Sequence, residues 1–373
     1  LMDTYRARKP NSSPSRRRIG AAATVYMVEE DSRGEGDDSV ATSISEEFAT
    51  RTAPYRRELL AYCSHMLGSV HDADDHIQET MLRAWKARDR YDGTRASVRT
   101  WLYRIATNVC LTALEGRAPG PLPSGPGAAS EDPGARRGPA LGIPRLEPFP
   151  DAGVDTDVRA DLRLALVAAM QVLPPRQRAV LVLREVLEFT AAEVAEQLGT
   201  TAAAVNSALQ RARAALAETG TGGVEEVAEP ADPEVRAVIQ RYVRACEAAD
   251  VPALVRLLTD EAVLEMPPVP TWFSGRERIG RFLATHVLTR PGDLRMVATS
   301  ANGQPALAGY HREADGAYRA YVLQVLTCGE GGVARITAFR DLRLFAVFGL
   351  PAVLPAEPAA GGGGAGGQSV CGL

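Results

Sequence analysis

Amide, hydroxyl and guanidinium side chains recur at helical spacing near the middle of the chain, where they could contact DNA. Amides can pair with adenine edges in the major groove, and arginines can pair with guanine edges or bind phosphate. The residues concerned are Asn206, Ser207, Gln210 and Arg213, with Arg211 on the flank of the same face. The spacing predicts a recognition helix, although an ordinary helix with a solvated outer face has the same composition.

Two short helices joined by a tight turn would position this polar face. Thr190 and Glu193 form a capping box that predicts the start of the first helix. Gly199 suits the left-handed residue that ends a helix, and Thr200 or Thr201 can cap the next one. The second helix has an inward stripe at Val205, Ala208, Leu209, Ala212 and Leu216. This arrangement predicts a helix-turn-helix.

A second helical module is expected over residues 45–116. A stripe of apolar residues ends at Gly68, and a helix beginning near Asp72 has an outer face with Asp74, Asp75, Gln78, Glu79, Arg83 and Lys86. A third helix, from Ser97, buries Val98, Trp101, Leu102, Ile105 and Val109. Its outer stripe is predicted to be Thr100, Tyr103, Arg104, Thr107 and Asn108.

Between the last two helices lies a polar loop, residues 90–97, with Tyr91, Arg95 and Ser97. A loop with an aromatic and a basic residue, next to a polar helix face, suits unpaired bases, because bases stack on rings while cations hold the backbone. A helical bundle with a solvated surface is the alternative, and the pattern alone leaves both open.

Composition limits the class of protein. A chain of 373 residues has room for two or three domains, and its net charge of −4 means that any DNA binding depends on local faces. The five cysteines are odd in number and form no C-x-x-C pair, which argues against a disulfide framework or a cysteine zinc site. No apolar run is long enough to span a membrane, and no signal segment opens the chain. We expect a cytoplasmic protein without membrane association, metal or cofactor.

The remaining segments differ in composition and in predicted secondary structure. Residues 1–44 and 352–373 are expected to be disordered tails, and residues 117–157 and 219–232 to be linkers rich in Pro, Gly or polar residues. Residues 158–218 form the second all-α module. Residues 233–351 read as helices followed by strands, which predicts an α+β domain with one curved antiparallel sheet.

These motifs together resemble the extracytoplasmic-function (ECF) group of sigma-70 family sigma factors, the promoter-recognition subunits of bacterial RNA polymerase. RRELLAYCSHMLGSVHDADDHIQETMLRAWK resembles region 2 of that group, and SVRTWLYRIATNVCLTAL resembles its helix that reads the −10 element. LPPRQRAVLVLREVLEFTAAEVAEQLGTTAAAVNSALQRARAAL resembles region 4. EMPPVPTWFSGRERIGRFL and FRDLRLFAVFGLP resemble the SnoaL-like domain, a cone-shaped α+β fold.

The resemblance implies roles for the polar faces. Asp75, Gln78, Glu79 and Arg83 would bind the largest subunit of core RNA polymerase, and the second-largest subunit is also an expected partner. The loop with Tyr91, Arg95 and Ser97 would open the duplex and capture a flipped −10 base, with Arg99, Arg104 and Asn108 along that DNA. The residues that would contact the −35 major groove are Thr201, Asn206, Ser207, Gln210, Arg211 and Arg213. We expect the arginines among them to bind mostly phosphate.

The SnoaL-like resemblance allows a small-molecule ligand in an apolar pocket. Candidate lining residues are Met266, Trp272, Phe273, Tyr310 and Tyr321, and candidate polar groups are Glu265, His311, Arg340 and Asp341. A His–Asp pair could perform acid–base chemistry if its members meet within hydrogen-bonding distance. Because fold does not imply function, we expect no catalytic residue and a regulatory domain instead.

The sequence thus favours a sigma factor that directs promoter-specific initiation. Two rivals stay open at this point. One is a small-molecule enzyme of the SnoaL type whose helical half is an adaptor, and the other is a plain helix-turn-helix repressor that binds duplex DNA without polymerase.

Overall fold

The computed structural model describes residues 46–116, 128–132, 134, 146–151, 163–218, 232–329 and 331–356. Two compact units divide the chain after Glu47, and the account that follows concerns the second, Phe48–Leu373. Expectations for residues 1–44, 117–127, 133, 135–145, 152–162, 219–231 and 357–373, the last range including Cys371, lie outside the described residues.

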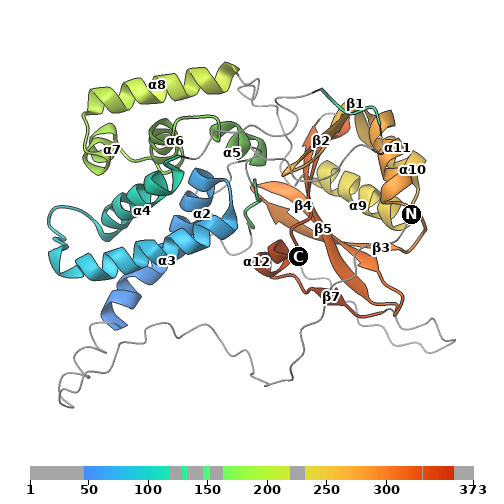
Figure 1. Cartoon of the computed structure of the whole chain (residues 1–373), viewed down its shortest axis with the longest axis horizontal. Coiled ribbons are helices and arrows are strands. Elements are labelled where there is room, and N and C mark those ends of the chain that lie inside the picture. Colours follow the sequence, from blue (N-terminus) through green and yellow to red (C-terminus); the bar gives the residue numbers. More distant parts are fainter. Residues whose placement is uncertain are drawn as a thin grey trace, which may run out of the picture. The chain divides into compact units, whose positions relative to one another are not determined.

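The first helical module comprises η1 (Ala53–Tyr55), α2 (Arg56–Leu67), α3 (Val70–Ala87), η2 (Arg88–Arg90) and α4 (Val98–Leu114) (Figure 1). Helix α2 ends at Gly68, whose φ of 77° is left-handed as expected. The Ser69 hydroxyl then accepts a hydrogen bond from the Asp72 backbone N–H and begins α3. Two residues, Gly68 and Ser69, therefore separate the helices, which makes a tight corner.

The inward and outward faces of α4 differ from the predicted ones at two positions. Tyr103 and Thr107, expected on the outer stripe, are fully buried. The Tyr62 hydroxyl and Thr107 Oγ1 are hydrogen-bonded at 2.8 Å, and the Tyr103 ring lies 5.4 Å from that of Phe189 in the second helical module. The prediction was wrong because it assigned this face to solvent, whereas Tyr62 of α2 packs on Thr107 and Phe189 of the second helical module packs on Tyr103.

The second helical module contains α5 (Leu164–Met170), α6 (Pro175–Leu181), the π-helical segment η3 (Val182–Val186), α7 (Ala191–Leu198) and α8 (Ala202–Glu218). The capping box of Thr190 and Glu193 is present, and Gly199 has a left-handed φ of 62°. The Thr201 hydroxyl accepts from the Ala204 backbone N–H at 3.2 Å, so Thr201 caps α8. The predicted helix-turn-helix is confirmed.

The C-terminal module is α+β, as expected. Its helices are α9 (Pro233–Glu247), α10 (Val251–Val255), α11 (Arg276–His286) and α12 (Arg343–Val347). Its strands are β1 (Leu258–Met266), β2 (Val269–Ser274), β3 (Leu294–Ala301), β4 (Gln304–Arg312), β5 (Tyr318–Gly329), β6 (Gly332–Phe339) and β7 (Val353–Leu354). They form a seven-stranded sheet in the order β2-β1-β6-β5-β4-β3, with β7 beside β5.

Two features of this sheet depart from expectation. Strands β1 and β6 pair in parallel, so the sheet is mixed and not wholly antiparallel. Strand β7 pairs with β5 through Tyr318 and Leu354, so regular structure continues beyond residue 351, where the disordered tail was expected to begin. Neither pairing is local, which is why the strand pattern of the sequence did not indicate it.

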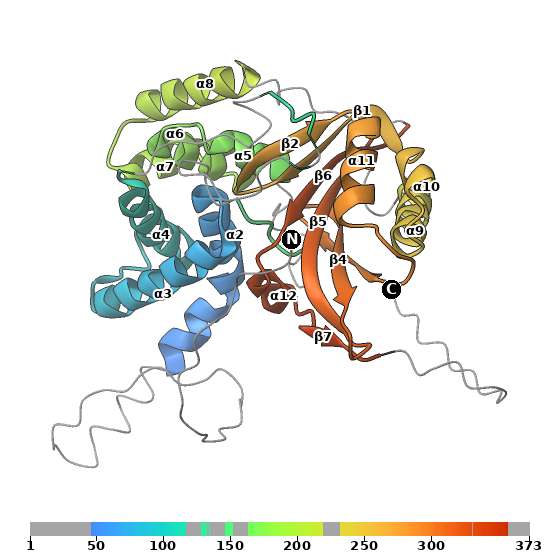
Figure 2. The same cartoon turned by 45° about the vertical axis from the view of Figure 1, so that its right-hand side comes forward.

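Helices cover both faces of the sheet. Helices α9, α10 and α11 gather on one side, where Tyr242 and Phe282 join Leu307 in one apolar core (Figure 2). Helix α12 lies on the other side, with the Phe345 ring 5.2 Å from that of Tyr310. Because successive strand residues point to opposite faces, Leu307 and Tyr310 of β4 belong to different cores.

Residues 146–151, here called the linker segment, pack against the C-terminal module. The backbone of Phe149 exchanges two hydrogen bonds with Asn302, at 2.9 and 3.0 Å. Asn302 and Gly303 have φ of 55° and 65° and form the turn between β3 and β4. Residues 146–150 are buried. Residues 146–150 of the predicted linker are therefore packed.

Candidate nucleic-acid interface

The outer face of α8 is exposed along its length. Val205 and Leu209, on the inner stripe, are 1% and 7% exposed, whereas all six predicted contact residues on the other face are exposed. Asn206, Ser207, Gln210 and Arg211 make no side-chain hydrogen bond or ion pair with any described residue. Unpartnered amides and a guanidinium on one rigid helix are what major-groove readout requires.

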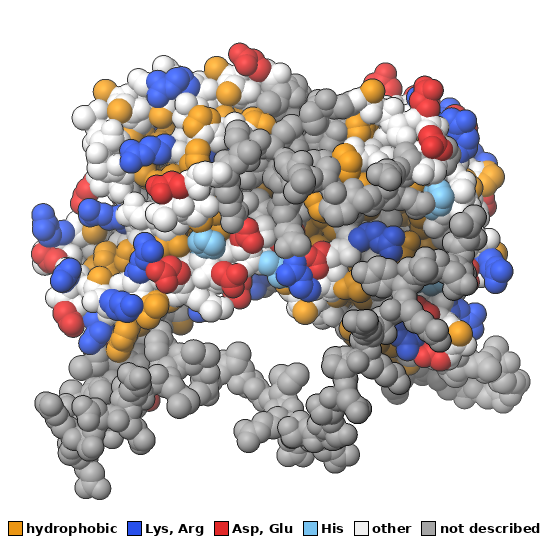
Figure 3. Space-filling model, in the orientation of Figure 1, with side chains coloured by type: hydrophobic (Ala, Val, Ile, Leu, Met, Phe, Trp, Pro, Cys, Tyr) orange, Lys and Arg blue, Asp and Glu red, His pale blue; other side chains and the backbone are white. Residues whose placement is uncertain are grey.

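The two other residues of that set have partners within the module. Thr201 caps α8 as described, and Arg213 Nη2 lies 2.7 Å from Glu185 Oε1 in an exposed ion pair. An exposed pair contributes about 0–1 kcal/mol, so Arg213 can exchange Glu185 for a phosphate at little cost. On the face that Figure 3 shows, Lys and Arg side chains alternate with Asp and Glu over the helical modules and form no continuous basic patch. DNA binding would thus rest on local contacts.

The loop before α4 is ordered by its own side chains. The Tyr91 hydroxyl donates to the Ala96 backbone carbonyl at 2.9 Å, and its ring lies 4.9 Å from that of Trp101. Ser97 caps α4 by accepting from the Thr100 backbone N–H. Hydrogen bonds from Thr94 lower the pKa of Asp92. Ser97 is exposed and Tyr91 half-buried, so the loop already holds an aromatic ring at its surface.

The predicted −10 residues on α4 fall into two groups. Arg104 and Asn108, four residues apart, are exposed on one side of the helix, and Arg95 of the loop is exposed too. Arg99 is half-buried: its Nε lies 3.3 Å from Glu58 Oε1, and its guanidinium carbon lies 4.9 Å from the centre of the Phe189 ring. Arg99 therefore joins the two helical modules and is not displayed like the other residues.

The predicted polymerase face of α3 points outward. Asp75, Gln78 and Arg83 are exposed, and Glu79 is half-buried. Arg83 Nε and Glu79 Oε1 are 2.6 Å apart in an i,i+4 pair, which stabilises the helix slightly. The acidic and amide groups lie opposite the buried stripe that contains Ile77, so they form one available surface.

One buried arginine fastens the two helical modules to each other. Arg178 of α6 is 3% exposed and donates to the Met66 carbonyl of α2. It also donates to Gln171 Oε1 at 2.6 Å and to the backbone carbonyls of Gln171 and Leu173. Burial lowers the pKa of Arg178 to about 10, which leaves it charged at neutral pH. The two helical modules are therefore packed against each other, an arrangement here called the closed state.

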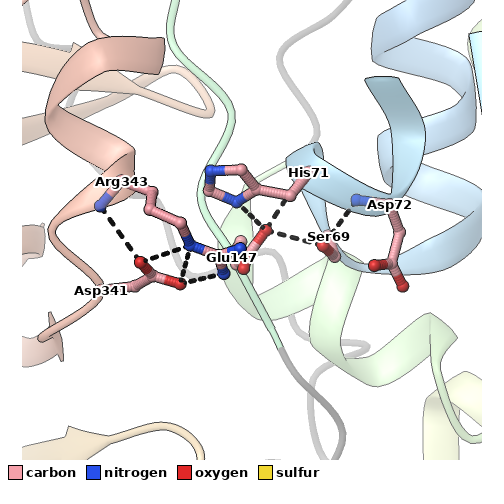
Figure 4. A network of polar contacts seen from close by, with 6 residues as sticks. All are labelled: Ser69, His71, Asp72, Glu147, Asp341 and Arg343. Atoms are coloured by element: carbon pink, nitrogen blue, oxygen red, sulfur yellow. Dashed lines mark hydrogen bonds and ion pairs between the residues drawn. The ribbon is translucent and has the colours of Figure 1, made fainter. Parts of the chain in front are cut away.

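A polar cluster joins α3, the linker segment and the C-terminal module (Figure 4). The carboxylate of Glu147, which is 3% exposed, accepts from the Ser69 hydroxyl at 2.6 Å and from the His71 backbone N–H at 3.2 Å. Its Oε2 also lies 2.9 Å from His71 Nδ1. Asp341, which precedes α12, pairs with Arg343 at 2.5 Å, and this pairing lowers the pKa of Asp341 to about 2.

His71, Glu147 and Asp341 each offer one ligand atom within 4.8 Å of the others, which is close enough to hold a metal ion. The guanidinium of Arg343 already binds the Asp341 carboxylate. A cation therefore already stands beside the acidic groups. The cluster reads as an ion-pair network that joins three parts of the chain, and the expectation of no metal stays a prediction.

A cavity of about 490 Å³ opens in the C-terminal module beside this cluster. Its apolar wall includes Leu264, Met266, Pro267, Pro268, Val269, Phe282, Leu283, Val287, Val322 and Phe339, and its polar groups are Glu147, Gln324, Arg340, Asp341 and Arg343. Of the five predicted lining residues, Met266 and Tyr321 line it.

The other three predicted lining residues lie elsewhere. Tyr310 faces α12 on the opposite side of the sheet, and the Phe273 ring packs 4.6 Å from that of Phe282 inside the core. The Trp272 carbonyl accepts from the Ser130 backbone N–H. Glu265 is fully buried and pairs with Arg335 at 2.8 Å. Choosing aromatic residues by type was wrong because strand alternation and helix cover decide which of them reach a cavity.

The residue that sequence reasoning missed is Glu147. It lies in the run Leu146–Pro150, an apolar island in a segment that we interpreted as a linker by composition. Apolar residues on both sides of a single acid were the available signal. The partner of Phe149 is Asn302 on the β3–β4 turn, and the partner of Glu147 is Ser69 at the α2–α3 corner. Both partners are distant in sequence.

No helix in the described ranges has both the length and the apolarity to cross a membrane. Family models match three parts of the chain: sigma-70 region 2 at residues 53–119, sigma-70 region 4 at 163–216 and the SnoaL-like domain at 239–339. These ranges contain the α8 face, the loop of residues 91–97, the α3 face and most of the cavity wall.

Similar proteins are sigma factors of the ECF group. The ECF RNA polymerase sigma factor SigG of Mycobacterium tuberculosis is 46% identical over 313 residues, covering 82% of this chain and 84% of SigG. SigW of Bacillus subtilis is 30% identical over 172 residues, covering 45% of this chain and 86% of SigW. The crystal structure of M. tuberculosis SigJ matches with a TM-score of 0.53 at 24% identity, covering 83% of this chain and 99% of SigJ, which shows a shared fold. The chain therefore belongs to the ECF family of RNA polymerase sigma factors and carries a C-terminal SnoaL-like domain.

Proposed function

We propose that this sigma factor reads the −35 element with the outer face of α8, opens the −10 element with the 91–97 loop and α4, and docks on core polymerase through α3. The observation that carries the proposal is the set of unpartnered polar groups on α8, opposite a buried stripe. Each good bidentate contact between an amide and a base is worth about 1–3 kcal/mol of discrimination.

Transcription from a randomised −35 library with reconstituted core polymerase tests the α8 assignment. Asn206→Ala or Gln210→Ala should relax the preference at one or two base pairs, whereas Arg211→Ala should weaken all promoters alike and reduce the salt dependence. Glu196→Ala, on the exposed side of α7, is the matched control. An unaltered base preference in both amide variants would contradict the assignment.

Docking through α3 predicts a loss of polymerase binding when the polar side chains on its exposed face are changed. Asp75→Lys and Gln78→Ala should weaken the complex with core polymerase measured by gel filtration, because both side chains are exposed on the same face. Exposure also means that neither change should alter the melting temperature by much. If a variant carrying both Asp75→Lys and Gln78→Ala still bound core polymerase, this face would be excluded.

We infer that the closed state is a resting form, because the two DNA-reading faces must separate to use one promoter. Elements centred on −10 and −35 are about 25 base pairs apart, roughly 85 Å along the duplex at 3.4 Å per pair. Arg178, Arg99 and the ring contact between Tyr103 and Phe189 hold the two helical modules together. Opening these contacts would precede promoter binding.

We infer further that the C-terminal module restrains this opening and acts without catalysis. The linker segment is bonded both to the α2–α3 corner, through Glu147, and to the β3–β4 turn, through Phe149. Within the described ranges His311 lies against the Tyr321 ring, while Asp341 is engaged by Arg343, so these two candidates form no acid–base pair. Glu147→Ala should raise transcription in vitro, and unchanged or lower activity would argue against restraint.

A further inference from the structure

We propose that the cavity of the C-terminal module binds an apolar molecule carrying one carboxylate group, and that the bound carboxylate loosens the hold of Glu147 on α3. The inference rests on the restraint proposed above and supplies the signal that would relieve it. Two independent features lead to it: the lining of the cavity, and the membership of Glu147 in both the cavity wall and the cluster.

The lining of the cavity sets the apolar part of the ligand. A volume of about 490 Å³ lies within the range of roughly 300–1,000 Å³ that is usual for small-molecule sites. Aliphatic, proline and phenylalanine side chains form most of the wall, and Gln324 and Tyr321 are its uncharged polar side chains. A long or branched hydrocarbon fits this surface better than a sugar or a nucleotide, which would leave polar groups unpaired.

Arg340 sets the charge of the ligand. Its guanidinium carbon lies 4.4 Å from the centre of the Tyr321 ring, and both residues line the cavity. Arg340 is exposed and has no carboxylate partner among the residues that the structure describes, whereas Arg343 is held by Asp341. A carboxylate on the ligand would give Arg340 a charge-assisted, bidentate hydrogen bond.

Glu147 connects the cavity to the helical half. Its buried carboxylate lines the cavity and accepts hydrogen bonds from Ser69 and from the backbone N–H of His71. The titratable or charged groups near it are His71, Asp341 and Arg343. A ligand carboxylate in the cavity would place a second anion beside this wall, and like-charge repulsion would weaken the hold of Glu147 on Ser69 and His71. The linker segment would then release the N-terminus of α3.

Calorimetric titration of the full chain with three ten-carbon probes tests the ligand class: decanoate, decan-1-ol and decyltrimethylammonium. Decanoate should bind at least about tenfold more tightly than the other two, since a hydrogen bond to a charged group is lost in each. Arg340→Ala should abolish that preference and Arg340→Lys should keep part of it. Arg312→Ala, an exposed arginine of β4 that does not line the cavity, should behave like the parent chain.

Hydrogen exchange tests the coupling. The amide of His71 donates to Glu147, so its exchange should become several-fold faster with saturating decanoate and stay unchanged with decan-1-ol. Equal affinity for all three probes, full binding by Arg340→Ala, or unaltered His71 exchange would each overturn the inference. These readouts need no polymerase. If they fail while Glu147→Ala still raises transcription, the ligand inference is wrong and the restraint stands. If they succeed while Glu147→Ala leaves transcription unchanged, the proposed restraint is wrong.

Discussion

Replacing Arg178 with Met removes the donor that joins the two helical modules while keeping most of the apolar stem. The guanidinium makes four hydrogen bonds, to the Met66 carbonyl, Gln171 Oε1 and the carbonyls of Gln171 and Leu173. Each acceptor left without a donor costs about 1 kcal/mol or more, and bonds to a charged donor are worth about 1.5–3 kcal/mol.

The magnitude is set by two opposing effects. All four acceptors are neutral oxygens, so the buried charge keeps a desolvation penalty of several kcal/mol that Met does not have. Subtracting that penalty from the four lost bonds leaves an expected destabilisation of about 3 kcal/mol. The desolvation penalty is real here, because burial lowers the pKa of Arg178 to about 10.

Urea unfolding of the full chain measures this value from the midpoint and slope of the transition. Arg176→Met is the matched control, because Arg176 is exposed on the same helix and should change the free energy of unfolding by at most about 0.5 kcal/mol. Exchange of amides at the end of α2 should also quicken in Arg178→Met. If Arg178→Met and Arg176→Met unfold at the same urea concentration, the reasoning about this contact is wrong.

Three further predictions concern other parts of the chain. Thr190→Ala removes the capping box of α7 and should lower stability by about 1 kcal/mol, seen as a lower melting temperature, whereas an unchanged temperature would show that the cap is dispensable. Arg343 holds the pKa of Asp341 at about 2, below its ordinary value of 3.8, so this carboxylate stabilises the fold above about pH 4 and loses its effect as the pH falls toward about 2. Acid unfolding should therefore shift less between those values in Asp341→Asn, and an identical acid transition would refute the assignment. Asn302→Ala should weaken the attachment of the linker segment to the β3–β4 turn, because it removes a hydrogen bond and places alanine at a left-handed φ of 55°. The Phe149 amide should then exchange faster than in the parent chain. Equal exchange would count against this contact.

Local patterns determined the helix-turn-helix. The capping box, the left-handed Gly199 and the inward stripe with Val205 and Leu209 act within a few residues of one another, so the sequence alone sufficed to predict them. The outward direction of Asn206 and Gln210 follows from the same 3.6-residue period. The likeness to sigma factors came from these motifs and their order along the chain.

Tertiary contacts decided what lies between the modules. Tyr103 and Thr107 are buried because residues distant in sequence pack on α4. Strands β1 and β6 pair in parallel because the chain brings two distant segments side by side in the sheet. Glu147 acquires its role only when the α2–α3 corner supplies Ser69 and the C-terminal module supplies the cavity wall. Helical period and turn chemistry report a residue's immediate neighbours, whereas burial, ion pairing and the lining of a cavity depend on which elements pack together. The sequence therefore determined which polar side chains α8 exposes, and the tertiary structure decided how the helical modules, the linker segment and the C-terminal module pack together.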